Sequence, residues 1–338
     1  MQSSQKPLRG VNLGGWLVLE QWMTPHLFAG TDAKDEYTFM QTPDAAIKIK
    51  KHRDSFITEE DFRWLAGNNY NAVRIPVGYW IFNGDNPFTP CIDYLDWAIK
   101  MATKYNLHAL ICLHGAPGSQ NGHDHSGRIG GAEWYNNPTY RQQTIDVISR
   151  LAARYKQQPA VWGIELLNEP NAWRLPWVLR RYHKDAYKAI QSTGREGLVT
   201  VFSDGFMPRY MSGTLKAVPE YPVMMDTHWY HFFMPKWVQR RLPFAFYQWQ
   251  LRRRTKLLIR LSKAQPVIMG EWSGVIGGEA LSRFDTSHHK ELTYRHLRDQ
   301  QRLFSHLAGW FYWNYKTERR GIFHYRSMNE DGHTEPPF

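Results

Sequence analysis

Two short apolar segments of the chain each lead into a glutamate. Residues 162–170 (WGIELLNEP) place Glu169 after a run of strand length, and residues 267–272 (VIMGEW) do the same for Glu271. A carboxylate at the C-terminal end of a barrel strand enters a cleft built by loops. Two of them there suit glycoside hydrolysis, in which one protonates the leaving oxygen and the other attacks the anomeric carbon. A single glutamate after a strand is more often a surface residue, but the matched pair favours catalysis.

Other strand ends also carry polar or aromatic side chains, and each of these alone would be explained as structural. Because the C-terminal ends of parallel barrel strands meet at one face, we expect these side chains to converge on the same cleft. They are Arg74, His114, His228, Tyr230 and Trp313. Strand alternation places Val267, Met269 and Glu271 on one face of their strand, and Glu165 and Glu169 on one face of theirs. We interpret Glu165 as a buried, paired structural carboxylate.

The elements that must position these residues alternate between strand and helix. Strands are predicted at residues 8–13, 71–77, 108–114, 160–168, 198–203, 223–230, 266–272 and 309–315, and helices at 58–68, 94–105, 139–155, 177–193, 246–262 and 289–307. Thr58 followed by acidic residues is a typical helix start. Eight parallel strand–helix units indicate an α/β fold closed into a (β/α)8 TIM barrel. No repeat or linker divides residues 1–338, so a single domain is predicted.

Composition excludes some classes of protein. The 338 residues contain no apolar run long enough to cross a membrane. There are two cysteines, Cys91 and Cys112, and Cys112 is expected to be a buried free thiol. Residues 1–9 have no apolar export signal, which predicts a cytoplasmic protein unless a leader has been removed. Aromatic residues make up 15% of the chain, which suits core packing and also sugar stacking.

The formal charge of +11 is concentrated in one stretch. Between Thr227 and Gly270 there is no Asp or Glu, whereas residues 236–263 hold nine Lys and Arg. A solvated helix face is the simplest explanation. An anionic membrane, an acidic glycan or nucleic acid are the alternatives. We expect an anionic surface rather than nucleic acid as a partner of this stretch, and a monomeric protein.

Several strings, in order along nearly the whole chain, resemble glycoside hydrolase family 5, and above all its fungal exo-β-1,3-glucanase branch. They are residues 9–16 (RGVNLGGW), 73–80 (VRIPVGYW), 113–122 (LHGAPGSQNG), 163–170 (GIELLNEP), 270–273 (GEWS) and 309–318 (GWFYWNYKTE). The resemblance implies a retaining mechanism with Glu169 as acid/base and Glu271 as nucleophile, without cofactor or metal. Arg74 would keep Glu271 ionised, and the charge of Glu271 would raise the pKa of Glu169.

The resemblance also implies a set of substrate contacts. Asn168 would hold the sugar 2-hydroxyl, and Tyr230 would bond the nucleophile. The other implied contacts are His114 and His228 in the polar wall, Trp313 at the floor, Glu20 on the far hydroxyls of the terminal glucose, and Phe233 at an aromatic entrance. The substrate would be β-glucan or a gluco-oligosaccharide.

The loop after residue 122 departs from the family pattern. The fungal branch has FDNSG where this chain has HDHSG, so His123 replaces an aromatic residue of the entrance. We assign His123 to substrate binding, because two histidines and an aspartate within three residues rarely fit one metal ion. Only twenty residues follow Glu318, which predicts a short eighth helix or coil.

The sequence therefore predicts a retaining β-glycoside hydrolase that releases glucose from β-1,3-glucan or its oligosaccharides, with transglycosylation as a side activity. One alternative is a β-glucosidase for a glycolipid or another glucan linkage. An alternative of another class is a non-catalytic glycan-binding or membrane-associated barrel, which would be free to lose one of the two carboxylates.

Overall fold

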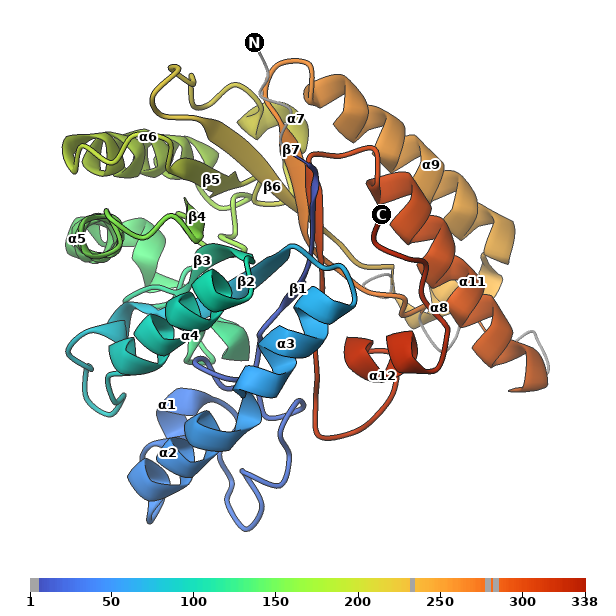
Figure 1. Ribbon diagram of the computed structural model, residues 1–338, viewed down its shortest axis with the longest axis horizontal. Helices are drawn as coiled ribbons and strands as arrows, with labels where there is room; N and C mark the ends of the chain where they lie inside the picture. The colour runs from blue at the N-terminus through green and yellow to red at the C-terminus, as the bar shows by residue number, and fades with distance from the viewer. Residues whose placement is uncertain (1–5, 232–234, 277–280, 282–285) are drawn as a thin grey trace.

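Eight parallel strands close into a barrel in the order of the chain (Figure 1). The computed structural model describes residues 6–231, 235–276, 281 and 286–338. Each strand pairs with the next one, and the last pairs with the first. The strands are β1 (Leu8–Asn12), β2 (Ala72–Gly78), β3 (His108–Gly115), β4 (Val161–Glu165), β5 (Val199–Ser203), β6 (Val223–Trp229), β7 (Val267–Trp272) and β8 (Gly309–Tyr312). The predicted (β/α)8 barrel is confirmed.

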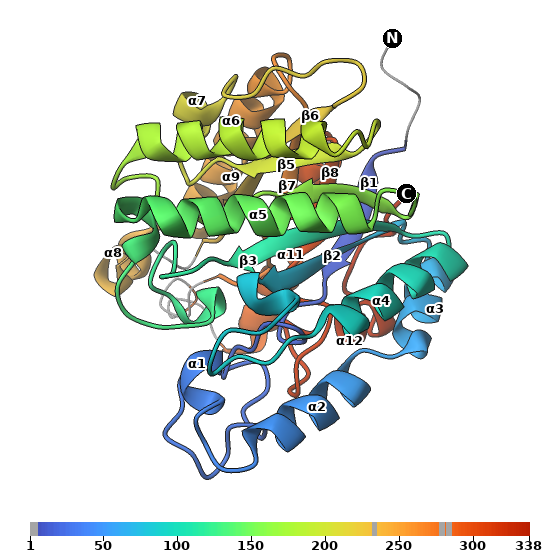
Figure 2. The ribbon, with the colours of Figure 1, turned by 90° about the vertical axis from the view of Figure 1, so that its left-hand side faces the viewer.

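Helices cover the outside of the barrel, and the six predicted ones are present. They are α3 (Glu59–Gly67), α4 (Ile92–Lys104), α5 (Pro138–Arg154), α6 (Pro176–Ser192), α9 (Phe244–Leu261) and α11 (Thr286–Phe304). Figure 2 shows α5 and α6 side by side on the outer surface. Among the described residues no helix is both long and apolar enough to cross a bilayer.

The other helices whose bounds the structure describes are short, apart from α2. They are α1 (Glu36–Phe39), α2 (Ala45–Phe56), α7 (Pro208–Met211), α8 (Lys236–Arg241) and α12 (Tyr325–Glu330). The six-residue α12 matches the predicted short ending. Single 3₁₀ turns, such as η2 (Asp124–Ser126), shape the loops at the C-terminal ends of the strands.

Local sequence explains where the helices begin. Thr58 precedes α3, and its backbone N–H donates to the Asp61 carboxylate at 2.8 Å, as in a capping box. Asn137 precedes α5, and its side chain accepts from the N–H of Thr139 at 2.9 Å. Pro138 then takes the first helical position, where its missing N–H costs nothing.

The barrel interior is apolar at one end and polar at the other. Residues from several strands fill the apolar end, among them Leu8, Leu110, Trp162, Val201, Ile268 and Phe311. A larger apolar layer lies between the strands and the helices. Both cysteines are buried and free. The rigid barrel therefore presents the polar C-terminal ends of its strands as one surface.

Candidate active site

Glu169 and Glu271 come together at the C-terminal end of the barrel. One oxygen of each carboxylate and one ring nitrogen of His228 all lie within 4.8 Å of one another. Both glutamates line a cavity of about 690 Å³, a size usual for ligand pockets. Retaining glycosidases hold their two carboxyl groups about 5–5.5 Å apart, closer than the inverting enzymes that must fit a water between them. The geometry therefore suits direct attack by one carboxylate.

Glu169 is placed by a loop, which the strand pattern did not predict. β4 ends at Glu165, and Glu169 has a left-handed φ of 40°. The prediction that one strand carries both residues on the same face is therefore wrong. Two amides of the 113–122 string hold this loop: Gln120 donates to the carbonyl of Asn168 at 2.9 Å, and Asn121 donates to that of Glu169 at 3.0 Å.

Glu271 is turned into the cleft by an irregularity in β7. Val267 and Met269 pack toward the helices, so regular alternation would send Glu271 the same way. The pairing register of β7 shifts between Met269 and Trp272, which reverses the direction of the side chains that follow. The predicted common face of these three residues is therefore wrong, although Glu271 reaches the cleft as expected.

Arg74 on β2 connects most of the polar groups beneath the cleft. It donates to both oxygens of Glu165, at 2.7 and 3.0 Å, which confirms Glu165 as a buried, paired carboxylate. Its Nη1 donates to Glu271 at 2.7 Å, which is the contact that the sequence predicts, and to Asn12 at 2.8 Å. Its Nη2 donates to the Asn168 side-chain oxygen at 2.8 Å. The buried guanidinium of Arg74 thus holds both Glu271 and Asn168, the residue that precedes Glu169.

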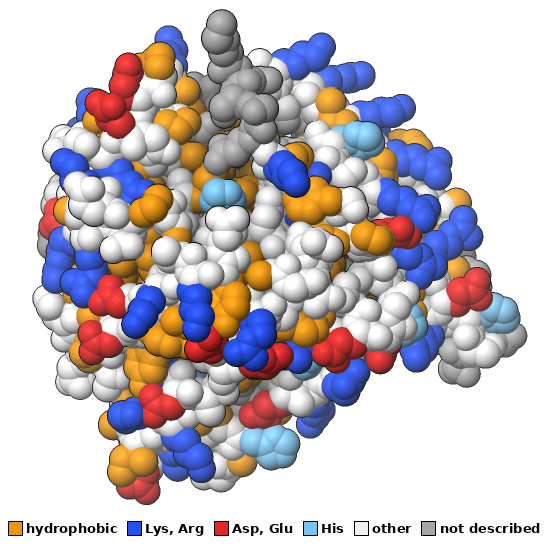
Figure 3. Space-filling model, in the orientation of Figure 1, with side chains coloured by type: hydrophobic (Ala, Val, Ile, Leu, Met, Phe, Trp, Pro, Cys, Tyr) orange, Lys and Arg blue, Asp and Glu red, His pale blue; other side chains and the backbone are white. Residues whose placement is uncertain are grey.

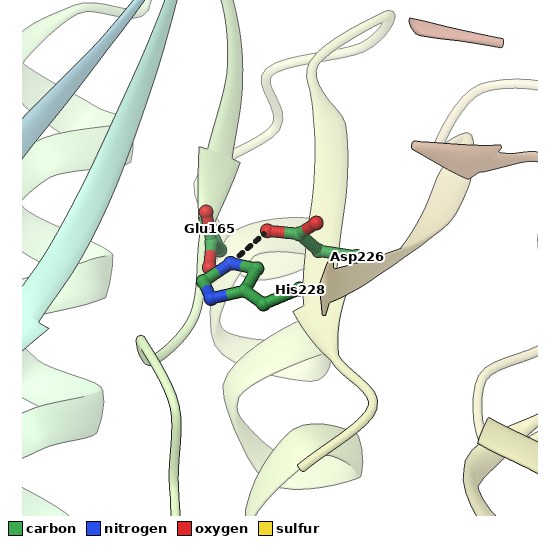
Figure 4. Close-up of side chains that lie close together, drawn as sticks. All are labelled: Glu165, Asp226 and His228. Atoms are coloured by element: carbon green, nitrogen blue, oxygen red, sulfur yellow. Dashed lines mark hydrogen bonds and ion pairs between the residues drawn. The ribbon is translucent and has the colours of Figure 1, made fainter. Parts of the chain in front are cut away.

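Asp226 on β6 is a functional candidate that the sequence analysis missed. It is fully buried, and its Oδ1 accepts from the Gly270 N–H at 2.6 Å. A Cβ on residue 270 would lie 2.0 Å from the Asp226 carboxylate, so only glycine fits there. Its Oδ2 lies 3.1 Å from Nε2 of His228 (Figure 4). Its spacing from His228 and Tyr230 along one strand would have indicated it.

The cluster of Glu165, Asp226 and His228 in Figure 4 has the donor atoms of a metal site, all within 4.8 Å of one another. A positive charge is already there, because Arg74 pairs with Glu165 at 2.7 Å and lies 3.9 Å from Asp226. The chemistry of the cluster is therefore that of a buried ion-pair network rather than of a metal cage.

His228 stands between the two catalytic candidates. Its Nδ1 lies 2.7 Å from Glu169 and 3.6 Å from Glu271, while its Nε2 faces Asp226. Burial lowers the pKa of His228. The negative charges of Glu271 and Asp226, together with the hydrogen bonds to Asp226 and Glu169, outweigh burial and raise that pKa well above its ordinary value. The ring therefore holds a proton next to Glu169.

The predicted order of the two carboxyl pKa values is wrong for the free protein. Burial raises the pKa of Glu169, but its hydrogen bond to His228 and the surrounding positive charges bring that pKa down to about 2. Burial raises the pKa of Glu271 to about 7, because the charges of His228 and Arg74 compensate it only in part. The predicted order took into account only the charges of the two carboxylates and of Arg74. It did not include His228, which lies between them.

The other predicted residues lie around the cavity. His114, His123, Tyr230, Trp313 and Glu20 line it. The Tyr230 hydroxyl donates to Glu271 at 2.9 Å, as expected. The rings of His114 and Trp313 are parallel, 5.5 Å apart, and burial lowers the pKa of His114 well below its usual value, so that wall is neutral. Phe233 lies outside the described residues.

Seven further described residues that line the cavity were not among the predicted site residues. His125 lies with its Nε2 3.4 Å from Glu169, beside the stacked ring of His123. Its position follows from the η2 turn, which no local pattern predicted. Three others are aromatic, namely Trp22, Phe206 and Phe323, and the last three are Asn121, Asp124 and Asn171. The Glu20–Trp22 spacing was a usable signal for the first of these, because the Trp22 indole donates to Glu20 at 2.8 Å.

Known proteins resemble this chain over nearly its whole length. The family model described as cellulase (glycosyl hydrolase family 5) matches residues 33–318. The chain belongs to glycosyl hydrolase family 5. Family members retain anomeric configuration and use two glutamates, so this hydrolase is a retaining O-glycosyl hydrolase.

Fungal proteins are among the relatives of the hydrolase. A probable glucan 1,3-beta-glucosidase A of Aspergillus niger is 33% identical over 92% of this chain and 83% of its own. A glucan 1,3-beta-glucosidase of Blumeria graminis is 31% identical over 97% of this chain and 87% of its own.

Solved structures share the fold at lower identity. The rutinosidase of Aspergillus niger superposes with a TM-score of 0.77 at 21% identity, covering 97% of this hydrolase and 98% of that chain. The endoglucanase Cel5A of Thermotoga maritima gives a TM-score of 0.59 at 18% identity, over 93% and 91% of the two chains. These likenesses establish the barrel architecture.

Proposed function

We propose that this hydrolase removes single glucose units from the ends of β-1,3-glucan and its oligosaccharides. The observation that carries the proposal is the placement of Glu169 and Glu271, whose nearest oxygens lie within 4.8 Å on the wall of one cavity. The relatives named glucan 1,3-beta-glucosidase, which match both chains over most of their length, support the substrate class.

In the first step the Glu271 carboxylate attacks the anomeric carbon, and the glycosidic oxygen leaves with a proton from Glu169. Arg74 and Tyr230 each donate to one oxygen of Glu271, at 2.7 and 2.9 Å, and so hold the carboxylate for attack. Because Arg74 donates to the side-chain oxygen of Asn168, the Asn168 amide nitrogen, which also lies 3.4 Å from Nδ1 of His125, would donate to the sugar 2-hydroxyl. That contact strengthens in the oxocarbenium-like transition state.

The proton for the leaving group comes along the 2.7 Å contact between His228 and Glu169. In the free enzyme the proton resides on His228, because the pKa of His228 is raised and that of Glu169 lowered to about 2. Its transfer to Glu169 gives the acid form while Glu271 stays ionised. In the second step Glu169 takes a proton from water, which attacks the glycosyl ester and frees Glu271.

The part of the cavity wall formed by Glu20 and Trp22 supports exo action. Glu20 lines the cavity with only 5% of its surface exposed, and Trp22 donates to it at 2.8 Å. Burial, and secondly the charge of Asp124, raise the pKa of Glu20 well above its usual range. A buried carboxyl group beside an indole suits the hydroxyls and the apolar face of a terminal glucose.

Product analysis tests the proposal. Laminaritriose, gentiotriose and cellotriose should be compared at equal concentration, and laminarihexaose should be followed from its earliest products. We expect laminaritriose to be preferred, with glucose and laminaribiose as first products, and laminarihexaose to yield glucose and laminaripentaose. Internal cleavage of the hexaose would contradict exo action, and preference for another triose would contradict the β-1,3 assignment. Absence of hydrolysis of every substrate would support a binding protein instead.

A further inference from the structure

The outer face of α9 carries a continuous row of basic and large apolar side chains. The helix buries Tyr247, Leu251, Thr255 and Leu258 against the barrel, which defines the opposite side as the outer one. On that side the exposed residues follow at spacings of three and four. We call them the outer stripe: Trp249, Arg252, Arg253, Lys256, Ile259, Arg260 and, just past the helix, Lys263. In Figure 3 a row of Lys and Arg side chains follows the upper right edge, where Figure 1 draws α9.

The five cations of the outer stripe have no carboxylate partner within the described part of the chain, and no Asp or Glu occurs between Thr227 and Gly270. Arg254 differs, because it points inward and lies 3.5 Å from Asp204. Arg254 is therefore not part of the outer stripe. The stripe itself is a line of uncompensated positive charge.

Large apolar side chains interrupt this line. Trp249 is 51% exposed, with the Arg253 guanidinium 5.1 Å from its ring centre, and Ile259 is 38% exposed. On the neighbouring α8, Trp237 is 64% exposed and Arg241 lies over its ring at 5.8 Å. A helix face that only needs solvation requires none of these. The combination of Lys and Arg with indole and aliphatic side chains is typical of segments that lie at a bilayer surface.

We propose that the outer stripe, with Trp237 of α8, binds the surface of an anionic lipid bilayer. Phosphate headgroups complement its cations, and the acyl boundary receives Trp249 and Ile259. Nucleic acids and acidic polysaccharides match the charge but have no apolar layer for an isoleucine.

Vesicle sedimentation tests this proposal with the full chain. We expect binding to vesicles that contain phosphatidylglycerol at low salt, little binding to phosphatidylcholine alone, and release as salt screens the charges. Each basic residue near an anionic bilayer contributes about fivefold to partitioning, so the triple variant R252Q/R253Q/K256Q should lose about 100-fold. The single variant W249A should bind these vesicles more weakly than the wild type at intermediate salt, where the charges are partly screened and the apolar contribution persists.

The matched control removes the same charge from another outer helix. Arg181, Lys184 and Lys188 are exposed on α6, so R181Q/K184Q/K188Q should bind vesicles like the wild type. Both triple variants should hydrolyse laminaritriose normally, which separates this test from that of the catalytic proposal. If both triple variants lost vesicle binding equally, the binding would depend on net charge alone, and the proposal would be overturned. The proposal would also be overturned if the wild type did not bind vesicles at low salt. It would be overturned equally if the protein bound heparin or RNA while W249A left vesicle binding unchanged.

Discussion

Replacement of Asp226 by asparagine should disable the proton supply to Glu169 while leaving the nucleophile in place. In the wild type Asp226 offers only acceptors, so Nε2 of His228 carries a hydrogen and Nδ1 exchanges a proton with Glu169. An asparagine would keep its oxygen on the Gly270 N–H and turn its amide nitrogen toward His228. His228 would then have to accept at Nε2 and keep its hydrogen at Nδ1. A protonated Glu169 would then place its O–H opposite the N–H of His228, two donors facing each other, so the acid form of Glu169 is disfavoured.

The expected loss follows from one hydrogen bond to a charged group. Such a bond contributes about 1.5–3 kcal/mol, which corresponds to about 10- to 150-fold in rate. The loss should appear in kcat/KM for laminaritriose, whose leaving group needs the proton. A dinitrophenyl glucoside, whose leaving group needs none, should react almost normally. Because Asp226 helps to raise the pKa of His228, the alkaline limb of the pH profile should move to lower pH.

The control variant is Asp204→Asn. Asp204 is also buried, at the end of the neighbouring strand, but its hydrogen bonds go to Thr227 and to the backbone of Phe206. It should change the thermal midpoint without separating the two substrates. Equal losses of D226N on the trisaccharide and the aryl glucoside, or an unmoved alkaline limb, would refute the reasoning about His228.

Four more predictions concern the same site. Glu169→Ala should slow laminaritriose far more than a dinitrophenyl glucoside, and azide should restore part of the rate as glucosyl azide forms; equal loss on both substrates would mean that Glu169 is not the acid. Since burial raises the pKa of Glu271 to about 7, kcat/KM should fall below about pH 7 as Glu271 takes up a proton. The pKa of Glu271 in the folded protein exceeds the unfolded value of about 4.3, so the stabilisation that Glu271 contributes is complete below about pH 4.3 and is lost as pH rises through about 7. Glu271→Gln should therefore unfold at a higher temperature than the wild type above about pH 7. If the difference in unfolding temperature between the two proteins did not change with pH between about 4.3 and 7, the raised pKa would be contradicted. A metal chelator should leave activity unchanged, because Arg74 already supplies the positive charge between Glu165 and Asp226; loss restored by zinc would contradict this.

The sequence predicts the barrel well because its signals are local. Apolar runs of strand length, separated by helical patterns, locate all eight strands. β1 and β6 end one residue before their predicted ends, and β4 and β8 end three residues before theirs. The pairing of Glu165 is also predictable, because a carboxylate inside a barrel strand needs a partner. The shift in β7 that turns Glu271 into the cleft depends on the neighbouring strands, and no local pattern encodes it.

The electrostatics of the site could not be predicted from pairs of residues. Arg74 and Glu271 were expected to meet, and they do, at 2.7 Å. The pKa of each carboxyl group, however, depends on how deeply it is buried and on His228, whose position between them is a property of the assembled barrel. Asp226 was within reach of strand alternation, whereas the contact of His125 with Glu169 depends on a loop turn.

The most direct test of the catalytic assignment is the anomer of the first glucose released. Proton NMR of laminaritriose hydrolysis, recorded before mutarotation, distinguishes the two possible products. Because Glu169 and Glu271 lie close enough for direct attack by one carboxylate, two successive inversions should retain the configuration, and β-glucose should appear first. Initial α-glucose would show a single inversion by water and would contradict the assignment of Glu271 as nucleophile.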